Sequence, residues 1–378
     1  MRRQLSRRRK LHNNEMNGRD MARKLLSITI PTYNRAKYLD LCLAQIKKNL
    51  VGFEDEIEVL VSDNASTDDT AAIVERHRAA GLVLTYSRNP TNIGMDRNFH
   101  ACFTKASGKY VWIFSDDSVM LDGAVETLLR ILREDDYGVV FLNHYDYDQD
   151  YLQPVGNRLM AMPKDSSKYV VFKVNREFVA EVNYWFSYIS GNIVNKEKIP
   201  ADFDTAQFFD TYLACASWYL VAALNAERNV IIYKCLLAEK TANTGGYGIA
   251  NVFGEGFSKV FVGLTKMGYP DRCFDPIKRE LIINFFPPTV FSIRRGIRLD
   301  NDRVCAEDYQ ENYNRVLKPL FSRYLAYWIY LLPVLQLPLA LAVPSLLLMI
   351  ARRAKWRFVN AVKFSLALDS ARYHVKPI

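Results

Sequence analysis

The sequence predicts an α/β fold with a mostly parallel, twisted, Rossmann-like sheet and helices on both of its faces. Short apolar runs alternate with helix-like stretches from residue 25 onward, and polar residues gather directly after the apolar runs. The 378 residues are long enough for a large core. Apolar residues make up 49% of the chain, which excludes a disordered protein. Six scattered cysteines without a C-x-x-C pair favour reduced thiols in a cytoplasmic compartment.

The elements follow one another in regular order up to about residue 143. Strands are expected at 25–30, 57–62, 82–87, 110–115 and 138–142. Helices are expected between them, at about 36–50, 67–80, 94–106 and 121–134. Beyond this point the pattern loosens, and we expect a helix over 175–185 and a longer one that starts near residue 207.

Polar residues follow four of the predicted strands. The segments are "PTYNR", "DNAST", "RNPTNIGMDRN" and "DDS". Because ligands of such sheets bind beyond the carboxyl ends of the strands, these four segments should meet at one edge and form a binding site.

Carboxylates dominate the chemistry of these segments, at Asp63, Asp116 and Asp117. No G-x-x-x-x-G-K-[ST] or G-x-G-x-x-G segment is present. Adjacent carboxylates repel, so Asp116 and Asp117 either lie solvated in a turn or meet a positive group from outside the chain. Hard oxygen ligands at a strand end suit Mg²⁺ or Mn²⁺ shared with a diphosphate. Asp63 is as readily a local cap of the following helix.

Three segments together resemble the family 2 glycosyltransferases in order and spacing, across residues 25 to about 135. They are "SITIPTYNRAKYLDLCLAQI", "EVLVSDNASTDDT" and "NPTNIGMDRNFHACFTKASGKYVWIFSDDSVM". The resemblance implies the glycosyltransferase A fold, a nucleotide-diphosphate-sugar donor, a divalent metal (Mn²⁺ or Mg²⁺) and inversion at the anomeric carbon. One departure is Ser115-Asp116-Asp117-Ser118, where the family often shows D-x-D-D.

The resemblance also implies roles for individual residues. Pro31, Tyr33 and Arg35 would line the nucleotide pocket, and Asp63 would contact the base. Asn92, Gly94 and Arg97 would close over the donor. Asp116 would face the ribose or sugar, and Asp117 would hold the metal.

The acceptor side is less well defined by the sequence. The family places the general base at the start of a helix after the donor half, where Asp210 fits best and Asp202 and Asp204 compete with it. Asp210 could equally be a helix cap. Acceptor-side candidates are Trp185, Tyr188, Gly191 and Asn192, for which core packing is the alternative.

The two ends of the chain carry much of the formal charge of +9. Residues 1–24 read as a disordered basic arm. Residues 324–351 are uncharged and flanked by basic residues, which predicts a re-entrant or in-plane membrane segment kinked near Pro338. The alternative is a helical pair packed on the domain. We expect five regions: 1–24, a donor-binding half (25–145), an acceptor-binding half (146–250), a helical extension (251–323) and a membrane-associated tail (324–378).

The resemblance favours the subgroup that builds bacterial surface polysaccharides such as O-antigen or capsule, including abequosyl- and rhamnosyltransferase-like enzymes. The expected acceptor is then a polyprenyl-linked saccharide, and the expected location is the cytoplasmic face of the inner membrane. Two alternatives remain: a catalytically degenerate nucleotide-binding scaffold on the membrane, and a sugar-nucleotide pyrophosphorylase. The second lacks its glycine-rich signature in "PTYNRAKYL". No nucleic-acid partner is expected, because no basic-aromatic patch accompanies the arm.

Overall fold

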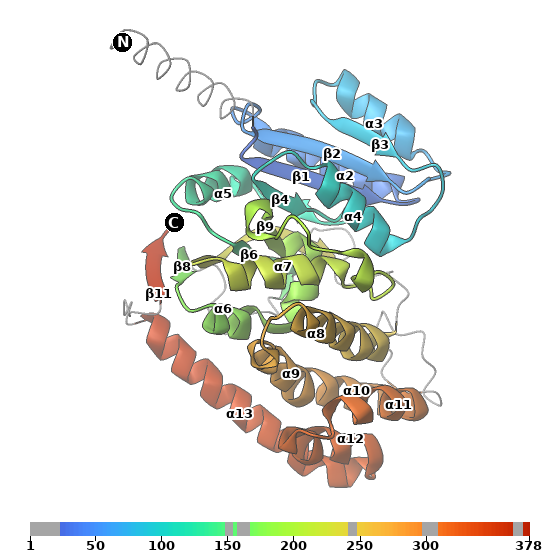
Figure 1. The fold of residues 1–378 in the computed structure, drawn as a ribbon, viewed down its shortest axis with the longest axis vertical. Helices are drawn as coiled ribbons and strands as arrows, with labels where there is room; N and C mark the ends of the chain where they lie inside the picture. Colours follow the sequence, from blue (N-terminus) through green and yellow to red (C-terminus); the bar gives the residue numbers. More distant parts are fainter. Residues whose placement is uncertain (1–22, 148–153, 157–166, 241–247, 297–308, 366–372) are drawn as a thin grey trace, which may run out of the picture.

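The computed structural model describes residues 23–147, 154–156, 167–240, 248–296, 309–365 and 373–378, so the predicted basic arm lies almost wholly outside the described residues. One twisted sheet crosses the molecule in the order β11-β8-β10-β6-β9-β4-β1-β2-β3, with β5 on β10 and β7 on β6 (Figure 1). Helices cover it, and a layer of further helices lies below it in the view of Figure 1.

The donor half follows the sequence prediction closely. Its parallel strands are β1 (Leu26–Thr32), β2 (Ile57–Asp63), β3 (Thr85–Arg88) and β4 (Tyr110–Ile113). Its helices are α2 (Ala36–Leu50), α3 (Thr70–Ala79), α4 (Met95–Lys105) and α5 (Ala124–Leu132). The third strand starts later than predicted, because the Leu82 N–H donates to His77 O and closes the end of α3. Helix α3 also starts later, where Asp68 accepts a hydrogen bond from Thr70 N at 3.1 Å.

The prediction of a mostly parallel sheet is wrong beyond β4, where the sheet is mixed. Its further strands are β5 (Val119–Met120), β6 (Val139–Tyr147), β7 (Pro154–Gly156), β8 (Lys168–Phe172), β9 (Asn192–Asn195), β10 (Asn229–Lys240) and β11 (Tyr373–Pro377). Strand β9 is antiparallel to both β4 and β6. It is a buried four-residue strand, too short to show a sequence pattern that reveals its direction.

Two helices, and a loop with two left-handed residues before the second of them, complete the acceptor half. Helix α6 (Asn175–Val182) is followed by 3₁₀ turns at Asn183–Ser187 and Ile189–Gly191. The helix predicted near residue 207 is α7 (Ala214–Asn225), which therefore starts later. Asp210 and Tyr212 have φ values of 64° and 62°, which a right-handed helix does not admit. Buried residues from Ala214 to Ala223 make α7 the central helix of the core under the sheet.

The C-terminal helices extend this core away from the sheet. They are α8 (Phe257–Lys266), α9 (Asp275–Glu280), α10 (Phe286–Arg294), α11 (Tyr309–Phe321), α12 (Leu332–Gln336) and α13 (Leu339–Ser365). Single π-helical turns occur at Ala250–Gly256, Leu281–Phe285 and Tyr327–Leu331. One continuous apolar cluster joins α7 to α8, α10, α11 and α12.

The predicted membrane tail consists of parts with different structures. Tyr327, Leu331 and Leu335 are buried among the other helices, so part of this segment packs on the domain. The chain breaks between α12 and α13 at Leu337–Pro338, near the predicted kink. Strand β11 then returns to the sheet beside β8, so the membrane prediction is wrong for the last described residues. Among the helices that the structure describes, none combines the length and the apolar character needed to cross a bilayer.

Candidate active site

A cavity of about 560 Å³ opens at the carboxyl ends of β1, β2 and β4. All four polar segments contribute to its wall, which confirms their predicted convergence. The donor half supplies Pro31, Thr32, Tyr33, Arg35, Asn64, Asn92, Gly94, Met95, Asn98, Phe99, Ser115, Asp116 and Asp117. The rest of the chain supplies Trp185, Ser187, Tyr188, Ile189, Ser190, Tyr212, Leu213, Glu239, Val252 and Phe253.

The two adjacent aspartates share one arginine from their own chain. Arg35 Nε lies 3.1 Å from Asp116 Oδ1, and the same guanidinium pairs with Asp117. Asp116 also accepts a hydrogen bond from Thr32 Oγ1 at 2.7 Å. The sequence indicated solvation or an outside cation, and it missed Arg35 as the partner because this residue precedes the aspartates by some 80 positions.

Burial sets the protonation of this pair. Asp116 is 3% exposed, and desolvation raises the pKa of its carboxyl to about 7, aided by the Asp117 charge and opposed by Arg35 and Thr32. Desolvation lowers the pKa of Arg35, but the two carboxylates outweigh it and the net direction is upward. The site is therefore a buried, only partly balanced cluster of charges.

These residues fit a divalent cation. Asp116 and Asp117 offer hard oxygen atoms beside a cavity, and a guanidinium already stands where positive charge is favourable. Mg²⁺ and Mn²⁺ take one or two protein carboxylates and complete their shell with water and phosphate. In the described part of the chain, no group of three or more His, Cys, Asp or Glu side chains is arranged to hold a metal ion.

Asp63 lies behind the cavity wall rather than in it. It is buried, accepts hydrogen bonds from Ser66 N at 2.8 Å and Tyr86 OH at 2.6 Å, and shapes the turn after β2. Its neighbour Asn64, which the sequence analysis missed, does line the cavity. Asn64 donates to Asn92 Oδ1 at 2.8 Å and accepts from Ile93 N at 3.0 Å, so it ties the Asn92–Gly94 loop to the end of β2.

Arg97 and Asp210 form a bidentate ion pair that is not part of the cavity lining, with contacts of 2.6 and 3.1 Å. The pair joins the start of α4 to the loop before α7. Their hydrogen bond raises the pKa of Arg97 and lowers that of Asp210. The competing candidates Asp202 and Asp204 are exposed and are likewise not among the lining residues.

Asp96, a second missed residue, holds the same loop in place. It is buried and accepts hydrogen bonds from Thr211 N at 3.0 Å, Tyr212 N at 2.9 Å and Ala214 N at 3.2 Å. Burial raises the pKa of Asp96, although these three N–H groups act in the opposite direction. Tyr212 is thereby held at the cavity wall in its left-handed conformation.

The acceptor-side candidates divide into lining and supporting residues. Trp185 and Tyr188 line the cavity. Gly191 lies against the Tyr188 ring, where a Cβ would overlap it. Asn192 is buried and donates to Trp185 O at 2.9 Å and Tyr188 O at 2.7 Å, which fixes the backbone of that wall.

Glu239 is the third missed residue, and it adds a further carboxylate to the wall. It accepts hydrogen bonds from Ser118 Oγ at 2.5 Å and from the Tyr188 hydroxyl. The pairing of β5 with β10 brings Glu239 beside Ser118, 121 positions earlier in the chain. Glu239 lies near the end of β10, a strand that the sequence analysis did not predict, and no sequence signal marked it.

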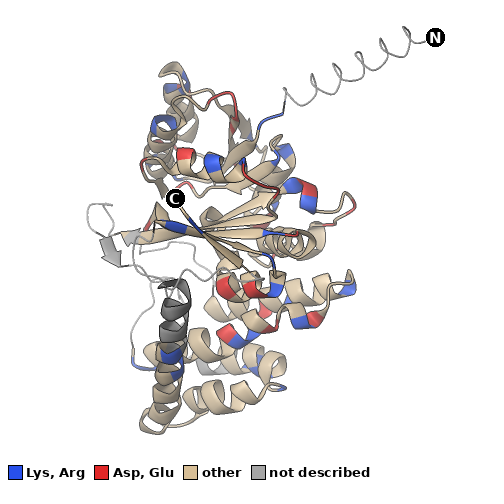
Figure 2. Cartoon of the chain, turned by 90° about the vertical axis from the view of Figure 1, so that its left-hand side faces the viewer, with Lys and Arg blue, Asp and Glu red and all other residues tan. Residues whose placement is uncertain are grey.

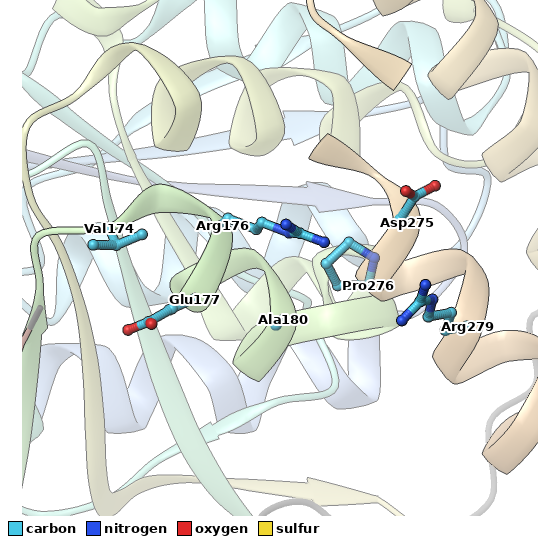
Figure 3. A pocket seen from close by; sticks show the side chains of 7 residues that line it. All are labelled: Val174, Arg176, Glu177, Ala180, Asp275, Pro276 and Arg279. Atoms are coloured by element: carbon cyan, nitrogen blue, oxygen red, sulfur yellow. The ribbon is translucent and has the colours of Figure 1, made fainter. Parts of the chain in front are cut away.

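A second cavity, of about 610 Å³, lies between α6 and α9 (Figure 3). Its lining consists of Val174, Arg176, Glu177, Ala180, Asp275, Pro276 and Arg279. Both signs of charge are mixed there, and no residue of the strand-end segments contributes. We therefore assign the donor chemistry to the cavity at the strand ends.

Comparison with known proteins agrees with this geometry. Residues 27–199 match the family model for glycosyl transferase family 2. This region of the chain is therefore similar to a family 2 glycosyltransferase domain. The matched region contains all the donor-side residues named above, and the match ends shortly after β9.

Individual relatives match only part of their own length. The chain is 34% identical over 196 residues to abequosyltransferase RfbV of Salmonella typhimurium, which covers 50% of this chain and 58% of that protein. It is 33% identical over 119 residues to the GalNAc(5)-diNAcBac-PP-undecaprenol beta-1,3-glucosyltransferase of Campylobacter jejuni, covering 31% of this chain and 37% of that one. The matches thus span 58% of the first relative and 37% of the second.

Solved structures show the shared fold. Residues 1–349 of Staphylococcus aureus TarS, in complex with UDP-GlcNAc, superpose with a TM-score of 0.54 at 17% identity, covering 79% of this chain and 82% of that chain. The architecture is accordingly of the glycosyltransferase A type, with a mixed sheet.

Proposed function

We propose that this chain is an inverting, metal-dependent glycosyltransferase. It transfers a hexosyl or deoxyhexosyl group from a nucleotide-diphosphate sugar to a hydroxyl of a polyprenyl-linked saccharide in bacterial surface polysaccharide assembly. The observation that carries the proposal is the Asp116–Asp117 pair, with Asp116 buried and Asp117 partly buried, at the wall of a large cavity in a region similar to family 2. The names of the relatives from Salmonella and Campylobacter support the acceptor class.

The donor would lie across the strand ends. Pro31 and Tyr33 face the cavity from the loop after β1 and would contact the nucleoside, with Asn64 beside them. Asp63 would support the base-binding turn from behind. The Asn92–Gly94 loop would cover the donor, and Asp116 would face its ribose or sugar.

A divalent cation held by Asp117, with Asp116 beside it, would neutralise charge on the leaving diphosphate. The acceptor hydroxyl forms a bond to the anomeric carbon while the bond to the diphosphate oxygen breaks on the opposite face. The hydroxyl proton passes to a carboxylate. Trp185 and Tyr188 would pack against the acceptor sugar.

Asp210 is the proposed base, and its ion pair with Arg97 restricts when it can accept a proton. While Arg97 holds it, the pKa of Asp210 is lowered, which makes the carboxylate a weak proton acceptor. The proposal therefore requires Arg97 to leave Asp210 when the donor binds and to turn toward the diphosphate, for which its planar fork is suited.

Thermal stability with UDP, GDP, CDP and dTDP, each with and without Mn²⁺, tests the donor site. We expect one nucleotide to raise the melting temperature of the native protein only with the metal, and Asp117→Asn to abolish that rise. Asp122→Asn is the matched control, because Asp122 is an exposed carboxylate of the same segment, paired with Lys48. If no nucleotide stabilises the native protein, the donor site as proposed is wrong and a degenerate scaffold becomes the better description.

We further propose peripheral attachment to the cytoplasmic face of the membrane through α13 and the turn before α12. The outward side chains there are apolar, at Leu325, Trp328, Leu341, Leu347, Leu348 and Ile350, and Leu341 and Leu347 are 61% and 60% exposed. The lowest helices in Figure 2 are mostly free of charged residues, and Arg352 follows the apolar face. Such a surface suits the headgroup region of anionic lipids.

Sedimentation with vesicles tests this attachment. We expect the full chain to sediment with phosphatidylglycerol vesicles and less with phosphatidylcholine vesicles, and Leu347→Glu with Leu348→Glu to reduce sedimentation at least fivefold. Val83→Glu is the control, because Val83 is an exposed apolar residue of the donor half. Equal sedimentation of both variants would contradict the assignment of this face.

A further inference from the structure

We propose that Arg35 is the resident counter-ion of the Asp116–Asp117 pair, and that it gives up this place to the divalent cation and turns to the donor diphosphate. The exchange of partners rests on the proposed function for its nucleotide half. Its metal half concerns the chain and a cation alone.

The carboxylate pair needs a positive neighbour whether or not a donor is bound. Asp116 is 3% exposed and directly precedes a second carboxylate. Burial removes the water that would otherwise screen their repulsion. Among the described residues that line the cavity, Arg35 is the one cation.

The position of the Arg35 guanidinium makes it a competitor for the same oxygen atoms. It contacts Asp116 Oδ1 through Nε at 3.1 Å and Asp117 Oδ2 through a terminal nitrogen. A cation bound to these two carboxylates would approach the oxygen atoms that the arginine now occupies. A dication and a guanidinium at the same oxygens would repel one another, so binding of one favours departure of the other.

The backbone of Arg35 is held in place, whereas its side chain can change position. Its carbonyl accepts hydrogen bonds from Tyr38 N and Leu39 N, both at 3.0 Å, which fixes the residue at the start of α2. The side chain is 27% exposed. Nε is buried without a hydrogen bond in the described structure, so its contact with Asp116 is an ion pair of imperfect geometry.

The diphosphate offers the guanidinium a better partner. Arginine binds phosphate oxygens with two parallel N–H groups, a geometry that its present contacts do not satisfy. The metal and Arg35 would then both lie beside the diphosphate, and each of these positive groups would have negatively charged neighbours. Cation and nucleotide should consequently strengthen each other's binding through Arg35.

Mn²⁺ binding without nucleotide, followed by the electron paramagnetic resonance signal of the free ion, tests the competition. We expect Arg35→Gln to bind Mn²⁺ at least tenfold more tightly than the native protein. Lys37→Gln is the matched control, since it removes the same charge from an exposed position two residues away. It should change the affinity less than threefold. Arg35→Lys, which keeps the charge but not the fork, should fall between Arg35→Gln and the native protein.

The same titration with UDP, or with whichever of GDP, CDP and dTDP the native protein binds, tests the exchange. The nucleotide should tighten Mn²⁺ binding at least tenfold more in the native protein than in Arg35→Gln. An Arg35→Gln affinity for Mn²⁺ equal to or weaker than that of Lys37→Gln overturns the proposal, as does equal tightening by nucleotide. If circular dichroism shows that Arg35→Gln is unfolded, Arg35→Lys decides, because its affinity must still exceed the native one. Absence of any nucleotide binding overturns the proposed function and the exchange, while the nucleotide-free titration still decides whether Arg35 and the cation compete.

Discussion

At Asp116, burial and one charged neighbour act against two other contacts on a single carboxyl group. Desolvation favours the neutral form, Asp117 adds to that preference, and Arg35 and Thr32 favour the charged form. The net pKa of about 7 means that the folded protein binds this proton more tightly than the unfolded chain does. Stability from this group is therefore present at low pH and is lost as the pH rises toward 7.

This balance makes the stability effect of Asp116→Asn depend on pH. The amide cannot ionise, so the variant should gain free energy of unfolding over the native protein between about pH 4 and pH 7. The gain should be at most about 1.4 kcal/mol per pH unit and should level off above pH 7. Urea unfolding of both metal-free proteins at several pH values measures it. A difference that is constant with pH would show that Asp116 ionises normally.

Glu239 allows a second test at the scale of single residues. Glu239→Ala removes the acceptor of the Ser118 and Tyr188 hydroxyls and should cost about 1–3 kcal/mol of unfolding free energy. Glu239→Gln keeps an oxygen acceptor and should cost less. In a double-mutant cycle with Tyr188→Phe, we expect a coupling of about 1 kcal/mol. Strict additivity would mean that the hydrogen bond contributes nothing to stability.

At the scale of elements, the contact between the start of α4 and the loop before α7 organises the acceptor side. Asp96 accepts hydrogen bonds from two backbone N–H groups of that loop and from the first N–H of α7, and Arg97 binds Asp210 in the loop. Two residues of the loop have left-handed backbone conformations, which cost free energy and persist only where surrounding contacts impose them. Asp96 is the residue that imposes them.

Removal of Asp96 should therefore release the loop as a unit. We expect Asp96→Ala to lower the free energy of unfolding by about 3 kcal/mol, because two buried N–H groups and one partly buried N–H group lose a charged acceptor. Hydrogen exchange of the amides of Thr211 and Tyr212 should accelerate more than that of α7. Asp210→Ala, which removes only the exposed ion pair, should cost much less than Asp96→Ala. Similar losses in the two variants would assign the loop's order to the ion pair instead.

At the scale of the whole molecule, β11 adds a strand to the sheet and covers the edge at β8. Strand β11 pairs with β8 from Tyr373 to Pro377, and Lys376 pairs with Glu134 at 2.8 Å. Without β11, β8 would be an exposed edge strand with four buried side chains. The C-terminal helices are thereby tied to the sheet at both ends of their path (Figure 1).

Deletion of residues 373–378 should lower the melting temperature by several degrees and promote association through β8. Thermal unfolding and light scattering measure the two effects. The control is Lys376→Gln, which removes the ion pair but keeps the strand, and it should leave both readouts close to native values. A truncated protein that stays monomeric at native stability would show that β11 contributes little.

The sequence was informative wherever a residue's place follows from a strand end. Asp116, Asp117, Arg35 and Asn92 each follow a predicted strand closely, and all line one cavity. Glu239 and Asp96 were missed because their roles depend on which distant segments pack together. Strand β9 was itself not predicted, for a similar reason: its place and direction depend on the path of the chain through the turns at 183–191 and not on its own four residues.

That antiparallel strand bears on how substrates enter. Strand β9 of the acceptor half bonds on one side to β4 and on the other to residues 139–141 of β6, both in the donor half, so one unbroken ladder joins the two halves. A hinge between them would have to break buried backbone hydrogen bonds. The two halves therefore cannot open and close by a hinge motion. A donor would instead enter through movements of side chains and loops at the rim of the cavity. Release of the Arg97–Asp210 ion pair would allow these loops to move.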